Sequence, residues 1–279
     1  MPAKISFDKV IKAVSIAILL IFIVVTVYPL IQTLLISIKP IDEFTLNPVG
    51  LPNKIRLENY MDAWKGGKFD SLFLNSIIVT FFTIVFTILL ASPAGFALAK
   101  LKLKGEKFIY SYLILGMIIP FQVIMVPLMK YVRMFHAINR IETLIVIYTA
   151  TSIILPVVMY TSFYKSIPDE IIEAAKIDGC SIIKVFGKIL FPLTPSINAT
   201  VAILVGMYPW RDFFIPLLFA TDEKSRTLAV GIYSFSSSFF NDWTIIFAAM
   251  VIQSIPLIIL YLVFQKTFVE GITSGAVKG

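Results

Sequence analysis

The segment KSIPDEIIEAAKIDGCSIIKVFGKILFP occupies residues 165–192 and lies between two long apolar stretches. An acidic pair begins at Asp169, directly after Pro168. This order is typical of the first turn of a helix, where proline fits and negative charge is favoured by the helix dipole. Gly179 can take the left-handed conformation that ends a helix and allows a turn. Because a second helical run follows over about 181–190, the segment predicts a helix-turn-helix.

One face of the first predicted helix carries almost no side-chain bulk. Ala174 and Ala175 are adjacent there, and we expect them to leave a bare surface that the backbone of a partner protein can approach closely. The alternative is that the two helices lie on lipid headgroups, as amphipathic helices do.

The composition around this segment indicates a membrane protein. Of 279 residues, 58% are hydrophobic and 15% are charged, against about 25% charged in an average soluble domain. Since a helix needs about 20 apolar residues to cross a bilayer, the apolar runs predict an all-α membrane protein with about six transmembrane helices in a single domain, residues 1–279. The expected spans are 13–38, 71–99, 108–129, 143–164, 197–220 and 244–264.

The lysines indicate the orientation of these spans. Residues 100–107 carry four lysines in a short loop, and short basic loops resist translocation most strongly. We therefore expect that loop, the helix-turn-helix loop 165–196 and the C-terminal tail 265–279 to be cytoplasmic. Six crossings then place both termini in the cytoplasm and make this a multi-pass protein of the cytoplasmic (inner) membrane.

Several classes of site are disfavoured by the sequence. A single cysteine, Cys180, and a single histidine, His136, exclude an intrachain disulfide and a metal site built from several such residues. We expect neither a catalytic residue nor a metal in this chain. The lysines and arginines are scattered between apolar runs, which argues against nucleic acid as a partner. No P-loop is present, since Gly67-Lys68 and Gly187-Lys188 are not followed by Ser or Thr.

The loop also resembles a known family. Glu173-Ala174-Ala175, then three residues, Gly179, nine residues, Ile189 and Pro192 resemble the EAA loop of importer permeases of the ATP-binding-cassette class. Residues 173–180 are similar to the version in carbohydrate permeases of the maltose type. Further segments similar to this family are 37–40, 75–76, 210–219, 226–228 and 265–279, so the resemblance covers nearly the whole chain. Phe191, where the family usually has Leu, and Arg211, where it commonly has Asn, depart from the pattern.

The resemblance implies a function, partners and docking residues. The chain would be the permease subunit of an ATP-driven importer that moves a sugar or oligosaccharide by alternating access; the alternative is an importer of a polyamine, peptide or phosphate compound. The loop would be a coupling helix docked on a cytoplasmic ATPase subunit through Glu173, Ala174, Ala175, Asp178, Gly179, Ile189 and Pro192. The tail would reach the ATPase subunits near the nucleotide through Gly271, Thr273, Gly275 and Lys278.

The same resemblance implies an assembly in membrane lipid. Its other parts would be a second, related permease subunit, two cytoplasmic ATP-binding subunits and an extracytoplasmic solute-binding protein. This chain would hold no cofactor, since ATP and Mg would be bound by the ATPase subunits.

The fifth span contains an interruption that suggests a solute path. Arg211 and Asp212 each cost roughly 2.5–3.5 kcal/mol at membrane depth unless they face a cavity or a partner. We expect Pro209 to free the backbone there, while Tyr208 and Trp210 offer aromatic faces to a sugar. The alternative is an interfacial anchor at the end of a shorter span. Polar residues of other spans either join this path or bond a neighbouring helix, so the candidate path comprises Tyr208, Trp210, Arg211, Asp212, Gln122, Ser92 and Asn75.

Overall fold

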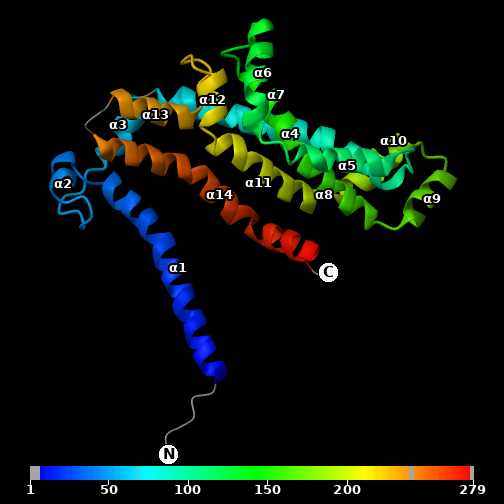
Figure 1. Cartoon of the computed structure of the whole chain (residues 1–279), viewed down its shortest axis with the longest axis horizontal. Coiled ribbons are helices and arrows are strands. Elements are labelled where there is room, and N and C mark those ends of the chain that lie inside the picture. Colours follow the sequence, from blue (N-terminus) through cyan, green and yellow to red (C-terminus); the bar gives the residue numbers. More distant parts are fainter. Residues whose placement is uncertain (1–6, 67, 239–241, 277–279) are drawn as a thin grey trace, which may run out of the picture. The chain divides into compact units, whose positions relative to one another are not determined.

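The computed structural model describes residues 7–66, 68–238 and 242–276, and within these ranges the chain is helical and has no strand (Figure 1). This confirms the predicted all-α class. The chain divides into two compact units. One consists of residues 1–69 and 232–255, and the other of residues 70–231 and 256–279.

The first unit begins with a long apolar helix. Its helices are α1 (Phe7–Ser37), α2 (Ile41–Leu46) and α3 (Glu58–Gly66), joined by parts of α13 (Leu228–Ser238) and α14 (Trp243–Ala276). In the most apolar 18-residue window of α1, within Ile11–Ser37, no residue is buried by the rest of the described chain. A helix this apolar and this exposed needs lipid or another protein around it.

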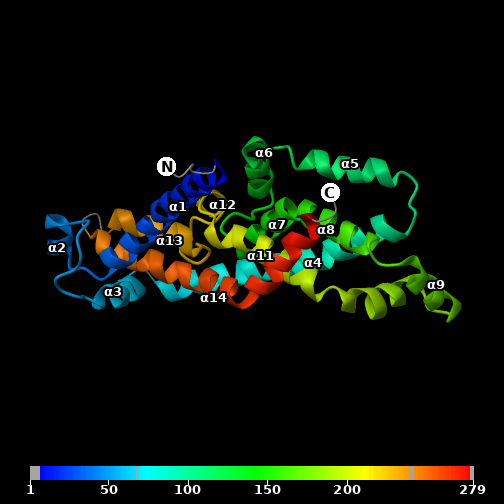
Figure 2. The same ribbon diagram turned by 90° about the horizontal axis from the view of Figure 1, so that it is seen from below.

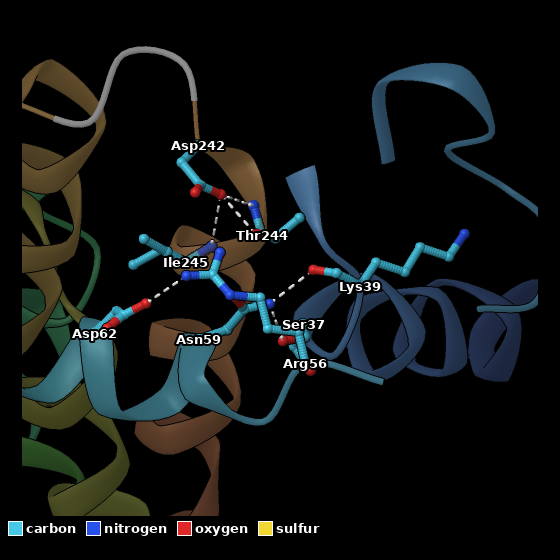
Figure 3. Close-up of polar contacts among 8 residues, drawn as sticks. All are labelled: Ser37, Lys39, Arg56, Asn59, Asp62, Asp242, Thr244 and Ile245. Carbon is cyan, nitrogen blue, oxygen red and sulfur yellow. Dashed lines mark hydrogen bonds and ion pairs between the residues drawn. The ribbon is translucent and has the colours of Figure 1, made fainter. Parts of the chain in front are cut away.

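The turn after α1 is held by polar side chains (Figure 3). Asn59 donates from Nδ2 to the carbonyls of Ser37 and Lys39, at 2.9 and 2.8 Å. Lys39 is fully buried and its ammonium donates to the carbonyls of Asn47 and Gly50. A buried lysine must have its charge satisfied, and here backbone carbonyls of the following loop satisfy it.

The second unit contains the predicted helix-turn-helix. Its elements are α4 (Phe69–Lys100), α5 (Glu106–Gly116), α6 (Phe121–Met134), α7 (Ile141–Ser152), α8 (Ile154–Lys165), α9 (Asp169–Ile177), α10 (Ile182–Lys184), the π-helix η1 (Val185–Leu190), the 3-10 helix η2 (Phe191–Leu193), α11 (Pro195–Arg211) and α12 (Phe214–Phe219), with parts of α13 and α14. Apolar cores organise the described part of this unit. One lies around Phe96, Tyr164 and Val185, and another around Tyr148 and Phe219.

Among the described residues, three helices are long and apolar enough to cross a membrane unbroken, and three bent pairs raise the number of possible spans to six. The pairs are α5 with α6, bent by 91°, α7 with α8, bent by 49°, and the segment 182–193 with α11, bent by 77°. Proline explains the first two breaks, because it cannot bond the carbonyl four residues earlier. Pro120 stands four residues after Gly116, where α5 ends, and Pro156 four residues after Ser152, where α7 ends.

Three expected segments therefore have a different shape, and one of them is 143–164, which falls in α7 and α8 and is bent by 49°. Residues 108–129 are not one straight helix but fall in α5 and α6, which meet at a sharp angle (Figure 2). The chain from residue 265 is not a separate tail, because α14 continues through Ala276. No proline interrupts the sequence after Pro256, so the helix of the last span extends past the apolar stretch.

Candidate functional site: a docking loop and a broken span

The loop after α8 folds as the helix-turn-helix that the sequence predicts. At the end of α9, Asp178, Gly179 and Cys180 each donate a backbone N–H to a carbonyl of that helix, at 2.9–3.0 Å. Gly179 has φ +77°, in the left-handed region that glycine adopts without a steric penalty. Figure 1 shows α9 at one end of its unit, beyond α8.

The second limb of the loop, which consists of α10, η1 and η2, is held by aromatic rings. The Ser181 hydroxyl accepts the N–H of Lys184 at 3.4 Å, and α10 then continues into the π-helix η1. Phe186 of η1 lies against Phe96 of α4 and Tyr164 of α8, with ring centroids 5.2 and 6.3 Å apart. π-Helical turns are rare in proteins, and those that occur are often at functional sites. This limb is therefore a further candidate for contact with a partner.

The two alanines of the loop have different environments. Ala174 is exposed, together with Glu173 and Asp178. Ala175 is only 6% exposed and packs with Ile172 in the core around Tyr164. The expectation that both alanines form one bare surface is therefore wrong for Ala175. Successive residues of a helix point about 100° apart, and here Ala174 points outward while Ala175 points into the core.

The remaining predicted docking residues lie around the turn and on the second limb. Gly179 and Pro192 are exposed, and Ile189 is half-buried. They share one loop with Glu173 and Ala174.

The start of α9 is fixed by a side chain that sequence reasoning counted only as a loop charge. Lys100, the last residue of α4, donates to the carbonyl of Ile167 at 2.6 Å and forms an ion pair with Asp169. The hydrogen bond from Lys100 and its charge, aided by Lys102 and Lys176, lower the pKa of the Asp169 carboxyl. A lysine at the end of a span and an acidic residue at the start of a helix were the available signals.

The helix of the fifth span is interrupted at Asp212, later in the chain than expected. Pro209 belongs to α11, which continues to Arg211, so it is Asp212 and not Pro209 that frees the backbone. Asp212 is extended, and its carboxylate accepts the N–H groups of Phe214 at 3.1 Å and Ile215 at 3.0 Å, at the start of α12. It also accepts the Tyr148 hydroxyl at 2.8 Å. An acidic side chain at a helix start satisfies otherwise unpaired amides.

The two aromatic residues of this region have separate surroundings. Tyr208 is half-buried and meets Tyr148 edge to face at 5.3 Å between centroids. Trp210 is 5% exposed and packs edge to face on Phe73 at 5.6 Å. Trp210 is thus part of the interior, while Tyr208 lies beside Asp212 through their shared contact with Tyr148. Arg211 is exposed.

Tyr208 also lines a cavity of about 630 Å³. The cavity lies where the α5–α6 and α7–α8 bends face α11, and its lining includes Pro120, Phe121, Thr151, Ser152, Met159 and Tyr208. Most of the lining is apolar, and the buried hydroxyl of Ser152 has no hydrogen-bond partner among the residues that the structure describes. Such a hollow, with a few hydroxyl groups on apolar walls, is typical of small-molecule sites.

The other predicted path residues do not join this group. Asn75 donates from Nδ2 to the carbonyls of Lys224 and Arg226 at 3.0 and 2.9 Å, and so holds a loop. Ser92 shares a hydrogen bond with the Tyr164 hydroxyl at 2.8 Å, in the other core. Gln122 is exposed near the start of α6. Asn75 and Ser92 therefore act as ties between elements.

The predicted tail contacts lie at the edge of the described chain. Gly271, Thr273 and Gly275 belong to the last turns of α14, and Lys278 lies outside the described residues. Among the residues that the structure does describe, no group of His, Cys, Asp and Glu is arranged to hold a metal ion.

Comparison with known proteins identifies relatives along nearly the whole chain. The family model described as "Binding-protein-dependent transport system inner membrane component" matches residues 91–274. The melibiose/raffinose/stachyose import permease protein MelC of Bacillus subtilis is 36% identical over 82% of this chain and 83% of its own length. The diacetylchitobiose uptake system permease protein NgcG of Streptomyces coelicolor is 30% identical over 99% of this chain and 92% of its own.

A solved structure has the same fold. A chain from the crystal structure of a bacterial ABC transporter involved in the import of the acidic polysaccharide alginate superposes with a TM-score of 0.83. The match covers 96% of this chain and all of that one, at 22% sequence identity.

Proposed function

Because the chain belongs to the family of binding-protein-dependent transport system inner membrane components, we propose that it is the permease subunit of an ATP-driven importer for a sugar or oligosaccharide. It is a multi-pass membrane protein and a transport subunit. The orientation follows from the basic loop 100–107, which argues for both termini on the cytoplasmic side of the inner membrane.

The exposed face of α9 is the observation that carries this function. Glu173 and Ala174 are exposed. The helix that carries them is nevertheless held at its start by Lys100 and along its inner side by Ala175. On the second limb, a Cβ built at Gly187 meets nothing within 4 Å, so the chain itself does not require glycine there. A rigid loop with small residues on its outer side suits close contact with a partner backbone.

The partner on this face would be a cytoplasmic ATPase subunit. This chain would join a second, related permease subunit in a heterodimer, with two ATPase subunits below and an extracytoplasmic solute-binding protein above. ATP and Mg²⁺ would be bound by the ATPase subunits, and this chain would need no cofactor of its own. We also assign the end of α14, with Gly271, Thr273 and Gly275, and Lys278 beyond it, to contact with the ATPase subunits.

A sugar is favoured over a polyamine, peptide or phosphate compound for two reasons. Both relatives compared above import oligosaccharides by name. The cavity also offers what a sugar requires, because Tyr208 gives it an aromatic face on which C–H groups pack, and Thr151 and Ser152 give it hydroxyls that bond to sugar hydroxyl groups. Arg211 and Gln122 are exposed and remain candidates for the same path, whereas Trp210 supports it from the interior.

Transport would follow from movement of the two permease subunits against each other. Closure of the ATPase subunits would displace the docking loops, and the attached helices would open the path to the other side of the membrane. A ligand shifts such an equilibrium only through its different affinity for the two states. The loaded binding protein and ATP would therefore each have to bind one state of the complex more tightly than the other.

The test is reconstitution of the complex that copurifies with this chain. We expect an ATPase subunit in that complex, and uptake of a labelled oligosaccharide into proteoliposomes only when ATP is present on the side of the docking loop. Uptake driven by an ion gradient without ATP, or purification without any ATPase, would contradict the proposal. A polyamine or peptide taken up in place of every sugar tested would retain the importer and reject its substrate class.

A further inference from the structure

The joint between α4 and α9 has an arrangement that the general role of the loop does not require. The Lys100 side chain is 6% exposed, whereas that of its partner Asp169 is 64% exposed. Lysine is almost never buried unless it is paired. Here the ammonium donates to two groups at the start of the docking loop, the carbonyl of Ile167 and the carboxylate of Asp169. Lys100 thus holds the connection to α9 and the first residue of α9 together.

Both charges of the pair stand at the favourable end of their own helix. Lys100 is the last residue of α4, where the helix dipole favours a cation, and Asp169 is the first residue of α9, where it favours an anion. The connection between α8 and α9 is short, and Ile167 also donates its N–H to the Tyr164 carbonyl at 3.2 Å. The orientation of α9 is therefore set at its start by α4 and α8 together.

The same end of α4 also holds the second limb of the loop. Phe96 precedes Lys100 by one helical turn, and residues four apart lie on the same side of a helix. Its ring contacts Phe186 of η1 at 5.2 Å between centroids. The last turn of α4 thus makes a polar contact with the first limb and an apolar contact with the second.

We propose that Lys100 is a positioning residue that latches α9 to the end of α4, so that a displacement of the docking loop by the ATPase subunit is delivered to α4. This inference rests on the proposed function. Without the latch, Phe186 still holds the second limb and Ala175 still packs the inner side of α9, but the start of α9 is no longer tied to α4 and can tilt about that inner contact. ATP hydrolysis then moves α9 without moving the span, and transport is uncoupled from hydrolysis.

Cys180 provides a probe of the latch that does not depend on transport. It is the only cysteine of the chain and is half-buried beside the turn, where its N–H bonds to the Ala175 carbonyl at 2.9 Å. Lys100→Met removes both contacts of the ammonium, while Lys104→Met removes an equal charge from an exposed position of the same basic loop. Lys100→Arg keeps the charge and tests rescue, and Asp169→Asn removes the ion pair alone.

The experiment measures maleimide labelling of Cys180 in the purified complex, together with uptake per ATP hydrolysed. We expect Lys100→Met to label severalfold faster than wild type and to lose most of its uptake per ATP while basal hydrolysis continues. Asp169→Asn should change both readouts in the same direction and by less. Lys104→Met and Lys100→Arg should remain near wild type.

Two results would overturn the latch. If Lys100→Met labels like Lys104→Met, then Lys100 does not hold α9. If labelling accelerates but uptake per ATP is unchanged, then the joint does not transmit the displacement. Should Lys100→Met fail to assemble, Asp169→Asn decides by the same two criteria. Absence of ATP-driven uptake in the wild-type complex would instead reject the proposed function, and the labelling rates would still test whether Lys100 holds α9.

Discussion

The docking loop and the break in the fifth span, which lie in one unit, differ in what they expose: the loop presents a surface, whereas the break keeps its polar groups inside. The loop keeps a helix rigid while leaving its outer side bare, with Ala174 outward and Ala175 inward. The break keeps charged and aromatic groups inside a largely apolar unit, and Asp212 is satisfied there by one hydroxyl and two backbone amides. In the first region one small residue, Ala174, is left outward, and in the second the polar residues are tied inward.

The difference teaches where a sequence signal for function can be trusted. Small residues and a glycine at fixed spacing describe a local shape, which the structure reproduces at the turn after α9. Polar residues in apolar spans describe only a need for partners. A neighbouring helix meets that need for Ser92 and a loop meets it for Asn75, and a solute is not required to explain them.

The largest effect is expected from Gly179→Pro. Proline holds φ near −65°, whereas Gly179 has φ +77° and donates its N–H to the Lys176 carbonyl at 3.0 Å. We expect the protein to reach the membrane, and uptake and solute-stimulated ATP hydrolysis to fall to background. Gly179→Asn is the control, because asparagine tolerates the left-handed region. Normal uptake in Gly179→Pro would show that the turn is dispensable.

Ala175→Glu tests whether the inward side of α9 is buried. An uncompensated buried charge costs on the order of 3–5 kcal/mol, so the loop should lose its structure and the purified subunit its thermal stability. The matched variant Ala174→Glu adds the same side chain to the exposed neighbour and should leave the unfolding temperature unchanged. Equal unfolding temperatures for the two variants would contradict the burial of Ala175.

Trp210→Ala and Tyr208→Ala separate interior from path in the fifth span. Removal of a buried tryptophan typically costs about 3–5 kcal/mol, so Trp210→Ala should reduce the amount of assembled complex. Tyr208→Ala should assemble normally and take up less oligosaccharide, because Tyr208 lines the cavity. If Trp210→Ala assembles fully and Tyr208→Ala transports like wild type, the cavity is not part of the path.

A smaller effect is expected from Asp212→Ala. The substitution removes the acceptor of the Tyr148 hydroxyl and the cap of α12, for a loss of about 1–3 kcal/mol of stability from a hydrogen bond to a charged group. Asp212→Asn keeps an acceptor oxygen and should lose less. Thermal unfolding of the purified subunit distinguishes the two, and an equal loss in both would mean that the negative charge itself is required.

Much of this arrangement could be predicted from the sequence, for identifiable physical reasons. Length and apolar character identify membrane helices without tertiary information, and the left-handed glycine identifies the turn at Gly179. Contacts between distant segments could not be read in this way. Lys100 meets Asp169 across 69 positions and Tyr148 meets Asp212 across 64, and no local pattern encodes either pair.

The positions of the helix bends could not be predicted from the local sequence either, because proline has different effects at different sites. Pro120 and Pro156 stand next to breaks, whereas Pro29, Pro93 and Pro209 lie inside continuous helices. A proline in a membrane helix is tolerated where neighbours satisfy the freed carbonyl. Which outcome occurs depends on packing that the sequence does not state.

The central claim is that the outer side of α9 contacts an ATPase subunit, and photocrosslinking from position 174 tests it most directly. A benzophenone amino acid placed there points away from the chain, since Ala174 is exposed while Ala175 is buried. In intact membranes we predict a covalent adduct between this chain and the ATPase subunit. An adduct with lipid alone, while the ATPase subunit still copurifies and hydrolyses ATP, would place α9 on the membrane surface and contradict the account.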